Sequence, residues 1–161
     1  MVSRSAAFLN REFRRIKENT SFSVGLVDGN IYTWEIIILG PEDSLYENGL
    51  FKAIMVFPEK YPDSPPKFKF ISEMWHPNID KEGNVCISIL HEPGDDAYGY
   101  ESVSERWMPV RNPESVIISI TSLLDCPNTD SPANIDAARE YRDAREIYNR
   151  KVRRLTQKTL E

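Results

Sequence analysis

One stretch of the chain combines a nucleophile with a side-chain amide. It runs from His76 through Pro77 and Asn78 to Cys86. Gly83, a residue with a permissive backbone, lies between Asn78 and Cys86. A free cysteine is intrinsically nucleophilic, and a neutral asparagine amide can donate a hydrogen bond to an oxyanion without changing its charge. These two groups suit acyl transfer through a thioester. The structural alternative stays open here, with Cys86 a small buried side chain and Asn78 a turn residue that satisfies its own loop.

Two other kinds of site would use the same residues. A cysteine hydrolase would pair Cys86 with His76 or His91, the two histidines of the chain, and the spacing singles out neither. A zinc site would recruit Cys86, Cys126 and both histidines. No pair among them has the short Cys-x-x-Cys or His-x-x-x-His spacing of structural zinc sites. We therefore expect no metal site.

The segments around this stretch predict an α+β domain with an antiparallel meander. The residues between 72 and 112 lack periodicity, and a long irregular stretch inside a domain is usually functional. Each predicted element has apolar periodicity or β-branched and aromatic residues, and most are bounded by turn residues. The predicted elements are a helix at 5–18, strands at 22–27, 31–39, 50–57 and 67–71, a helix from 112, and a short then a longer helix within 134–158.

Composition excludes several classes of protein. The longest apolar run, 53–57, is far shorter than the ~20 residues of a membrane-spanning helix, and the N-terminal segment is too charged for a signal peptide. Two cysteines make no disulfide framework, so we expect a reducing compartment. The formal charge of −5 argues against a nucleic-acid partner. We expect a cytoplasmic protein that can reach the nucleus or the cytosolic face of the endoplasmic reticulum through its partners.

The sequence closely resembles the ubiquitin-conjugating enzyme family over nearly the whole chain. His76-Pro77-Asn78 followed by a cysteine eight residues after the asparagine is a specific signal. The resemblance implies one catalytic domain over 1–161, with Cys86 in a shallow groove. It also implies a four-stranded antiparallel sheet flanked by an N-terminal, a central and C-terminal helices. The other matching pieces are the basic first helix, Gly40-Pro41, Phe57-Pro58, Tyr61-Pro62, Pro65-Pro66, Trp107 and Asp130-Ser131-Pro132.

An acidic insertion at about 91–106 indicates which subgroup of the family the sequence resembles. Its 16 residues, HEPGDDAYGYESVSER, replace the few that the shortest family members have at this point. Such an insertion marks an acidic-loop subgroup, and CISILHEPGDDAYGYE together with SPANIDAA looks most like its G-type branch. Members of that branch tend to build the degradation-type polyubiquitin chain. The resemblance implies the same product here.

The reaction implied by the resemblance is two successive acyl transfers. Cys86 accepts ubiquitin from the activating enzyme as a thioester, and a substrate lysine then collects it as an isopeptide. Asn78 is the expected oxyanion donor or loop support, whereas His76 and Pro77 are expected to be structural. ATP is used by the activating enzyme, so we expect no cofactor. A catalytically inactive ubiquitin-binding variant of the same fold is the alternative.

The chain departs from the family where acidic residues usually assist the lysine. Ser131 stands where members often carry an aspartate, and Ser88 stands two residues after the cysteine, where an acid is common. We expect Asp95, Asp96 or Glu101 of the insertion to replace that assistance in part by attracting the ammonium. The alternative is a solvated acidic loop without a catalytic part.

The resemblance also implies the surfaces that meet the partners. The exposed basic face of the first helix, Arg11, Arg14 and Arg15, is expected to steer the acidic activating enzyme. Ligases of the family dock on the same helix and on two loops, here near Pro62-Asp63 and Pro109-Val110. Asp63 stands where members that serve thioester-forming ligases often carry phenylalanine, which favours a RING-type ligase.

Overall fold

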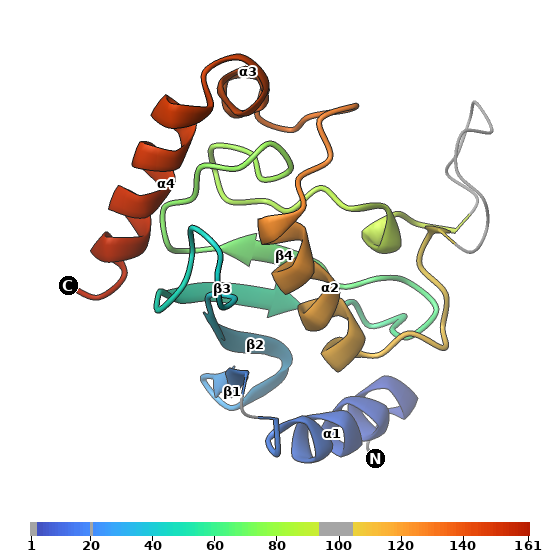
Figure 1. The fold of residues 1–161 in the computed structure, drawn as a ribbon. Helices are drawn as coiled ribbons and strands as arrows, with labels where there is room; N and C mark the ends of the chain where they lie inside the picture. Colours follow the sequence, from blue (N-terminus) through green and yellow to red (C-terminus); the bar gives the residue numbers. More distant parts are fainter. Residues whose placement is uncertain (1–2, 20, 94–104) are drawn as a thin grey trace.

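The computed structural model describes residues 3–19, 21–93 and 105–161, and its centre is an antiparallel sheet of four strands (Figure 1). The strands follow one another in sheet order, so the predicted meander is confirmed. Their bounds lie within one residue of those that the pattern predicts: β1 Phe22–Val27, β2 Asn30–Leu39, β3 Leu50–Val56 and β4 Lys67–Phe70.

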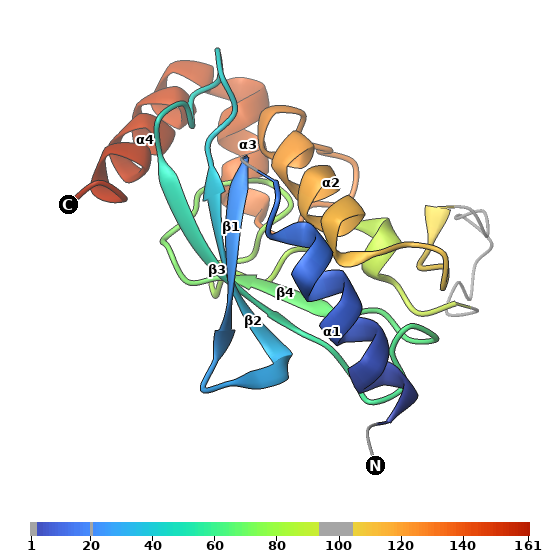
Figure 2. The same ribbon diagram turned by 90° about the horizontal axis from the view of Figure 1, so that it is seen from below.

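Helices cover the sheet, and the first three α-helices each begin where a side chain satisfies a free backbone N–H group. Ser3 caps α1 (Arg4–Ile16), Asn112 caps α2 (Pro113–Asp125) and Asn134 caps α3 (Ile135–Asp143). The last helix, α4 (Arg145–Lys158), follows directly after a break at Ala144. Figure 2 shows α1 and α2 side by side next to the sheet. No helix within the described ranges is long and apolar enough to cross a membrane.

The core lies between the sheet and the helices. Alternate residues of β2, namely Trp34, Ile36 and Ile38, are completely buried, as the period of two in a strand requires. The apolar face of α2, with Val116 and Ile120, is buried just as fully. Regular structure is sparse between β4 and α2, where the described residues form one 3₁₀ turn, η1 (Ser88–Leu90). The irregular stretch between β4 and α2 is therefore flanked by two elements whose apolar faces are buried in the core.

Candidate active site

The backbone that carries Cys86 is anchored to β4. Val85 N–H donates to the Phe68 carbonyl at 3.1 Å, and Phe70 N–H donates to the Gly83 carbonyl at 2.8 Å. Gly83 has a φ of 102°, and a Cβ there would lie 2.1 Å from the Phe70 oxygen. Only glycine fits so close to the strand in that conformation. The last strand thus determines where the Cys86 segment runs.

Asn78 links this segment to the loop that follows α2. Its own carbonyl accepts the Cys86 N–H at 2.8 Å, while its side chain holds both backbone groups of Asn128. Asn78 Nδ2 donates to the Asn128 carbonyl at 2.7 Å, and Asn78 Oδ1 accepts from the Asn128 N–H at 2.8 Å. The second N–H of the amide has no part in this pair of hydrogen bonds. Asn78 is therefore built into the loop and still has a donor to offer.

His76 and Pro77 brace the same loop from inside. The His76 ring is completely buried, its Nδ1 accepts from the Asn78 N–H, and its Nε2 lies 2.8 Å from the Leu123 carbonyl. This arrangement requires the neutral tautomer with the proton on Nε2. The Pro77 carbonyl accepts from Ala133 N–H at 2.8 Å. Both residues hold backbone, and neither ring nitrogen of His76 is free to serve as a base.

The buried imidazole makes a prediction about acid stability. Burial lowers the pKa of His76 to about 4 from an ordinary value near 6.5. Because the unfolded chain binds this proton first, the free energy of unfolding should be undiminished above pH 6.5 and should fall as the pH drops toward 4. The loss should reach roughly 3 kcal/mol. Urea unfolding across this range, with the His76 ring followed by NMR, measures it. A ring that takes up its proton near pH 6.5 in the folded protein would contradict the prediction.

A groove of about 600 Å³ lies over Cys86. The Cys86 side chain is exposed at its wall, and Asn78, Ser88 and Ser131 line the same groove. The structure therefore brings four of the predicted site residues together. Asp95, Asp96 and Glu101 lie outside the described residues.

The groove contains acidic groups that the sequence interpretation did not select. Asp130 and Glu105 both line it and are exposed. Asp130 directly precedes Ser131, so its place beside the groove follows from the turn. Glu105 belongs to the insertion that was predicted to be acidic, and only its contact with the groove singles it out. Carboxylates are thus present near Cys86 although Ser88 and Ser131 are neutral.

The environment of Cys86 favours the protonated thiol. Partial burial and, after it, the negative charge of Asp80 raise the pKa of Cys86. Asp80 is itself held in a tight turn: its Oδ1 accepts from the Glu82 and Asn84 N–H groups, which lowers the pKa of the Asp80 carboxyl. The charge that acts on the thiol is therefore permanent at neutral pH.

Removing that charge should make the thiol more acidic. In a Cys126→Ala background, Asp80→Asn is expected to move the pH profile of Cys86 alkylation toward lower pH. The rate of iodoacetamide labelling against pH measures the shift, and Glu82→Gln in the same turn is the matched control. An unchanged profile for Asp80→Asn would show that burial alone sets the acidity.

The second cysteine occupies a different place. Cys126 is the C-cap of α2 and is exposed, but it does not line the groove of Cys86. Within the described part of the chain, no three histidine, cysteine or acidic side chains gather so that they could hold a metal ion.

The predicted partner surfaces come together near α1. Phe8 of α1 packs on Tyr61, Tyr61 packs on Trp107, and Trp107 Nε1 donates to the Pro62 carbonyl at 2.7 Å. Pro62 itself is buried, whereas Asp63, Pro109 and Val110 are exposed, Val110 by 83%. The first helix and the two predicted loops therefore lie next to one another, and Pro62 is not one of their exposed residues.

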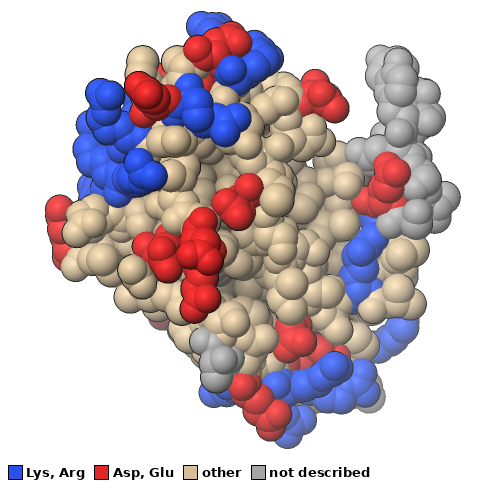
Figure 3. All heavy atoms as spheres, viewed as in Figure 1, with Lys and Arg blue, Asp and Glu red and all other residues tan. Residues whose placement is uncertain are grey.

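Basic side chains gather in two regions of this face of the molecule (Figure 3). One lies over α1, where Arg11, Arg14 and Arg15 are all exposed. The other lies over α3 and α4, whose sequence between 139 and 158 has eight basic and three acidic residues. The predicted basic face of the first helix is thus open to solvent.

Comparisons with known proteins place the chain in a family. A model described as "Ubiquitin-conjugating enzyme" matches residues 8–156. The chain is 52% identical to "Ubiquitin-conjugating enzyme E2 15" of Schizosaccharomyces pombe, an alignment that covers 99% of this chain and 97% of the relative. It is 50% identical to "Ubiquitin-conjugating enzyme E2 7" of Arabidopsis thaliana, with 100% and 99% covered. It is 51% identical to human "Ubiquitin-conjugating enzyme E2 G2", with 81% and 79% covered.

Proposed function

Because the chain belongs to the ubiquitin-conjugating enzyme family, in the G-type branch, we propose that Cys86 is its thioester-forming nucleophile. The observation that carries this proposal is an exposed thiol on a strand-anchored backbone, in a groove that also contains the Asn78 amide. Cys126 is exposed as well but lies outside that groove.

The first step exchanges one thioester for another. The Cys86 thiolate attacks the carbonyl carbon that joins the C-terminus of ubiquitin to a cysteine of the activating enzyme. The new C–S bond forms as the activating enzyme's thiolate leaves, and a proton from the Cys86 thiol goes to solvent. A raised pKa makes Cys86 a poorer leaving group, so the resulting thioester persists until an amine arrives.

The second step moves ubiquitin to an amine. The neutral lysine amine attacks the thioester carbonyl, a C–N bond forms as the C–S bond breaks and the Cys86 thiolate leaves, and the proton lost by the nitrogen goes to that thiolate or to solvent. We assign the second N–H of the Asn78 amide, which the two hydrogen bonds to Asn128 do not use, to the oxyanion, while those two bonds keep the loop in place. A thioester is already activated, so positioning and oxyanion stabilisation are sufficient in principle.

The alternative of a Cys–His hydrolase would have to use His91, which lines the groove of Cys86, because His76 cannot serve as the base. Both ring nitrogens of His76 are engaged inside the protein, at 2.9 Å and 2.8 Å from their partners. The low pKa of the buried ring also makes it a poor proton acceptor. An inactive binding variant is disfavoured by an exposed thiol in a groove.

Acidic groups of the insertion and of the groove are proposed to assist the incoming lysine. A lysine ammonium has an ordinary pKa near 10.4, so it must be attracted and then deprotonated. Asp95 and Asp96 of the insertion, together with Glu105 and Asp130 of the groove, supply negative charge although Ser131 and Ser88 are neutral.

Neutralising the insertion should slow discharge to lysine and leave charging unchanged. We expect Asp95→Asn with Asp96→Asn to lower the discharge rate several-fold, most clearly below pH 8, because fewer ammonium groups are attracted. Single-turnover discharge of the Cys86 thioester to free lysine measures the effect, and Glu42→Gln with Asp43→Asn, in the turn after β2, is the matched control. Unchanged discharge across the pH range would end this role for the insertion.

We further propose a RING-type ligase as partner and degradation-type polyubiquitin chains as product, acting in the cytoplasm. Support comes from Asp63 at the exposed loop beside α1 and from the G-type likeness of the sequence. The test is a reaction with activating enzyme, ATP, ubiquitin and a panel of RING and thioester-forming ligases. Mass spectrometry of the chains identifies the linkage. Chains formed only with thioester-forming ligases, or of another linkage, would overturn this part.

A further inference from the structure

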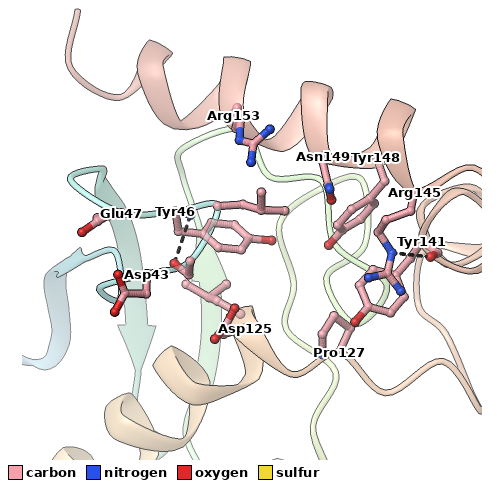
Figure 4. Close-up of a pocket in the computed structure, with 13 residues that line it drawn as sticks. Asp43, Tyr46, Glu47, Asp125, Pro127, Tyr141, Arg145, Tyr148, Asn149 and Arg153 are labelled. Carbon is pink, nitrogen blue, oxygen red and sulfur yellow. Dashed lines mark hydrogen bonds between the residues drawn. The ribbon is translucent and has the colours of Figure 1, made fainter.

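A second hollow lies between α4, the end of α2 and the 41–49 connection of β2 and β3 (Figure 4). Its volume is about 460 Å³, which is within the range of ligand pockets. Among the described residues, none lines both this hollow and the groove of Cys86. Its chemistry is therefore separate from the transfer reaction.

The hollow contains a buried hydroxyl, that of Tyr46, which interacts with the side chain of Tyr148 but makes no hydrogen bond of good geometry among the described residues. Tyr46 is only 3% exposed. The position of the ring is set by its surroundings: it packs edge-on against Phe51 with centroids 5.6 Å apart, and Gly49 N–H holds the Tyr46 carbonyl. A buried hydroxyl without a well-formed hydrogen bond is destabilising unless something else meets it. It marks a place where a ligand atom could accept a hydrogen bond.

Three more donors reach the hollow from α4. Tyr148, Asn149 and Arg153 line it and point down from the helix toward Tyr46 (Figure 4). Burial raises the pKa of Tyr148 to about 12 and holds the pKa of Tyr46 well above its usual value, so both phenols keep their protons at neutral pH. One wall is therefore rich in donors and carries a guanidinium, which suits an anionic acceptor.

The opposite wall limits how much negative charge the hollow can accept. Asp43, Glu47 and Asp125 line it, and the charge of Asp125 contributes to the raised pKa of Tyr46. Arg145 is already engaged, since its Nε donates to the Tyr141 carbonyl and its guanidinium lies 3.5 Å from the centre of the Tyr141 ring. A dianion such as phosphate would meet three carboxylates, whereas a monoanion accompanied by a cation would match both walls.

We propose that this hollow binds a carboxylate side chain of a partner protein's exposed peptide segment. The carboxylate accepts hydrogen bonds from Tyr46, Tyr148 and Arg153, and its aliphatic stem lies on the tyrosine rings. A basic residue of the same segment faces Asp43 and Glu47. Charge complementarity on two walls and the pair of tyrosine hydroxyls, of which that of Tyr46 lacks a hydrogen bond of good geometry among the described residues, carry the assignment.

The test is a titration of the ¹⁵N-labelled full chain with the blocked peptide acetyl-Gly-Lys-Gly-Glu-Gly-amide. Saturable shifts are expected around Tyr46 and along α4, and replacing Glu by Gln in the peptide should weaken binding about tenfold. Arg153→Gln should weaken it by a similar factor, whereas Arg154→Gln, on the same helix outside the hollow, should not. Tyr46→Phe should weaken binding about threefold and leave Tm nearly unchanged, because the lost hydroxyl makes no hydrogen bond of good geometry among the described residues.

Several results would overturn the proposal. They are the absence of saturable shifts up to about 20 mM peptide, equal binding of the Gln peptide, and an unchanged affinity in Arg153→Gln. If free glutamate binds as tightly as the peptide, the assignment to a peptide segment is wrong. If inorganic phosphate binds more tightly than the peptide, the choice of a carboxylate is wrong. Cys86 charging should be unaltered in all these variants, so failure here is distinct from failure of the proposed function.

Discussion

Cys86→Ala is expected to abolish every ubiquitin adduct of this chain, because no other residue in the groove offers a thiol. The wild type, incubated with activating enzyme, ATP and ubiquitin, should gain a reductant-labile mass of one ubiquitin. Cys86→Ser should form an adduct that resists reductant, because an oxyester replaces the thioester. Intact-protein mass spectrometry with and without dithiothreitol measures all three.

The control for this experiment is the second cysteine. Cys126→Ala should be charged at the wild-type rate, because Cys126 caps α2 outside the groove. A reductant-labile adduct that survives in Cys86→Ala and disappears in Cys126→Ala would reverse the assignment and refute the proposed mechanism.

Asn78→Ala is expected to lower the rate of discharge to lysine by about 10²-fold or more, the usual effect of removing an oxyanion donor. The same change removes both side-chain hydrogen bonds to the Asn128 backbone, so the free energy of unfolding should fall by about 1–3 kcal/mol. Single-turnover discharge and urea unfolding on the same preparations measure the two effects.

Two further variants separate catalysis from loop support. Asn128→Ala keeps the backbone groups that Asn78 binds, so it should retain discharge within about tenfold of the wild type. Asn78→Asp keeps the acceptor of the Asn128 N–H but places a carboxylate oxygen against the Asn128 carbonyl, so it should lose stability together with the donor. If discharge falls in Asn78→Ala by about 10²-fold while the loss of stability stays within about 1–3 kcal/mol and the protein remains folded at the assay temperature, the oxyanion role is supported; if discharge falls only in proportion to the unfolded fraction, the residue acts by holding the loop. Discharge of Asn78→Ala within threefold of the wild type would contradict both roles.

The elements of the fold could be predicted because their signals are local. The alternation of Trp34, Ile36 and Ile38 determines which face of β2 is buried, and Asn112-Pro113 marks the start of α2 through its cap. The differences are at element ends: α1 ends at Ile16 and not at residue 18, and β3 and β4 each end one residue earlier than predicted. Ends depend on tertiary contacts that a local pattern does not contain.

The candidate site was predicted only in part. The HPN tripeptide and Cys86 were visible because their spacing is itself a motif, but nothing in the sequence pairs Asn78 with Asn128. That contact joins a side chain to backbone atoms 50 residues away, and backbone atoms carry no sequence signal. Glu105 was overlooked for a similar reason, since its neighbours in the insertion are equally acidic and only its contact with the groove distinguishes it.

The amino-acid sequence alone determined the family, the order of strands and helices, and the cysteine most suited to chemistry. All of these follow from residue types at fixed separations along the chain. Packing decided the rest: that His76 is a buried neutral ring, that Cys126 lies outside the groove, and that the Tyr46 hydroxyl is buried beside Tyr148 of α4. These properties arise where distant segments meet, and burial and partner geometry exist only once they have met.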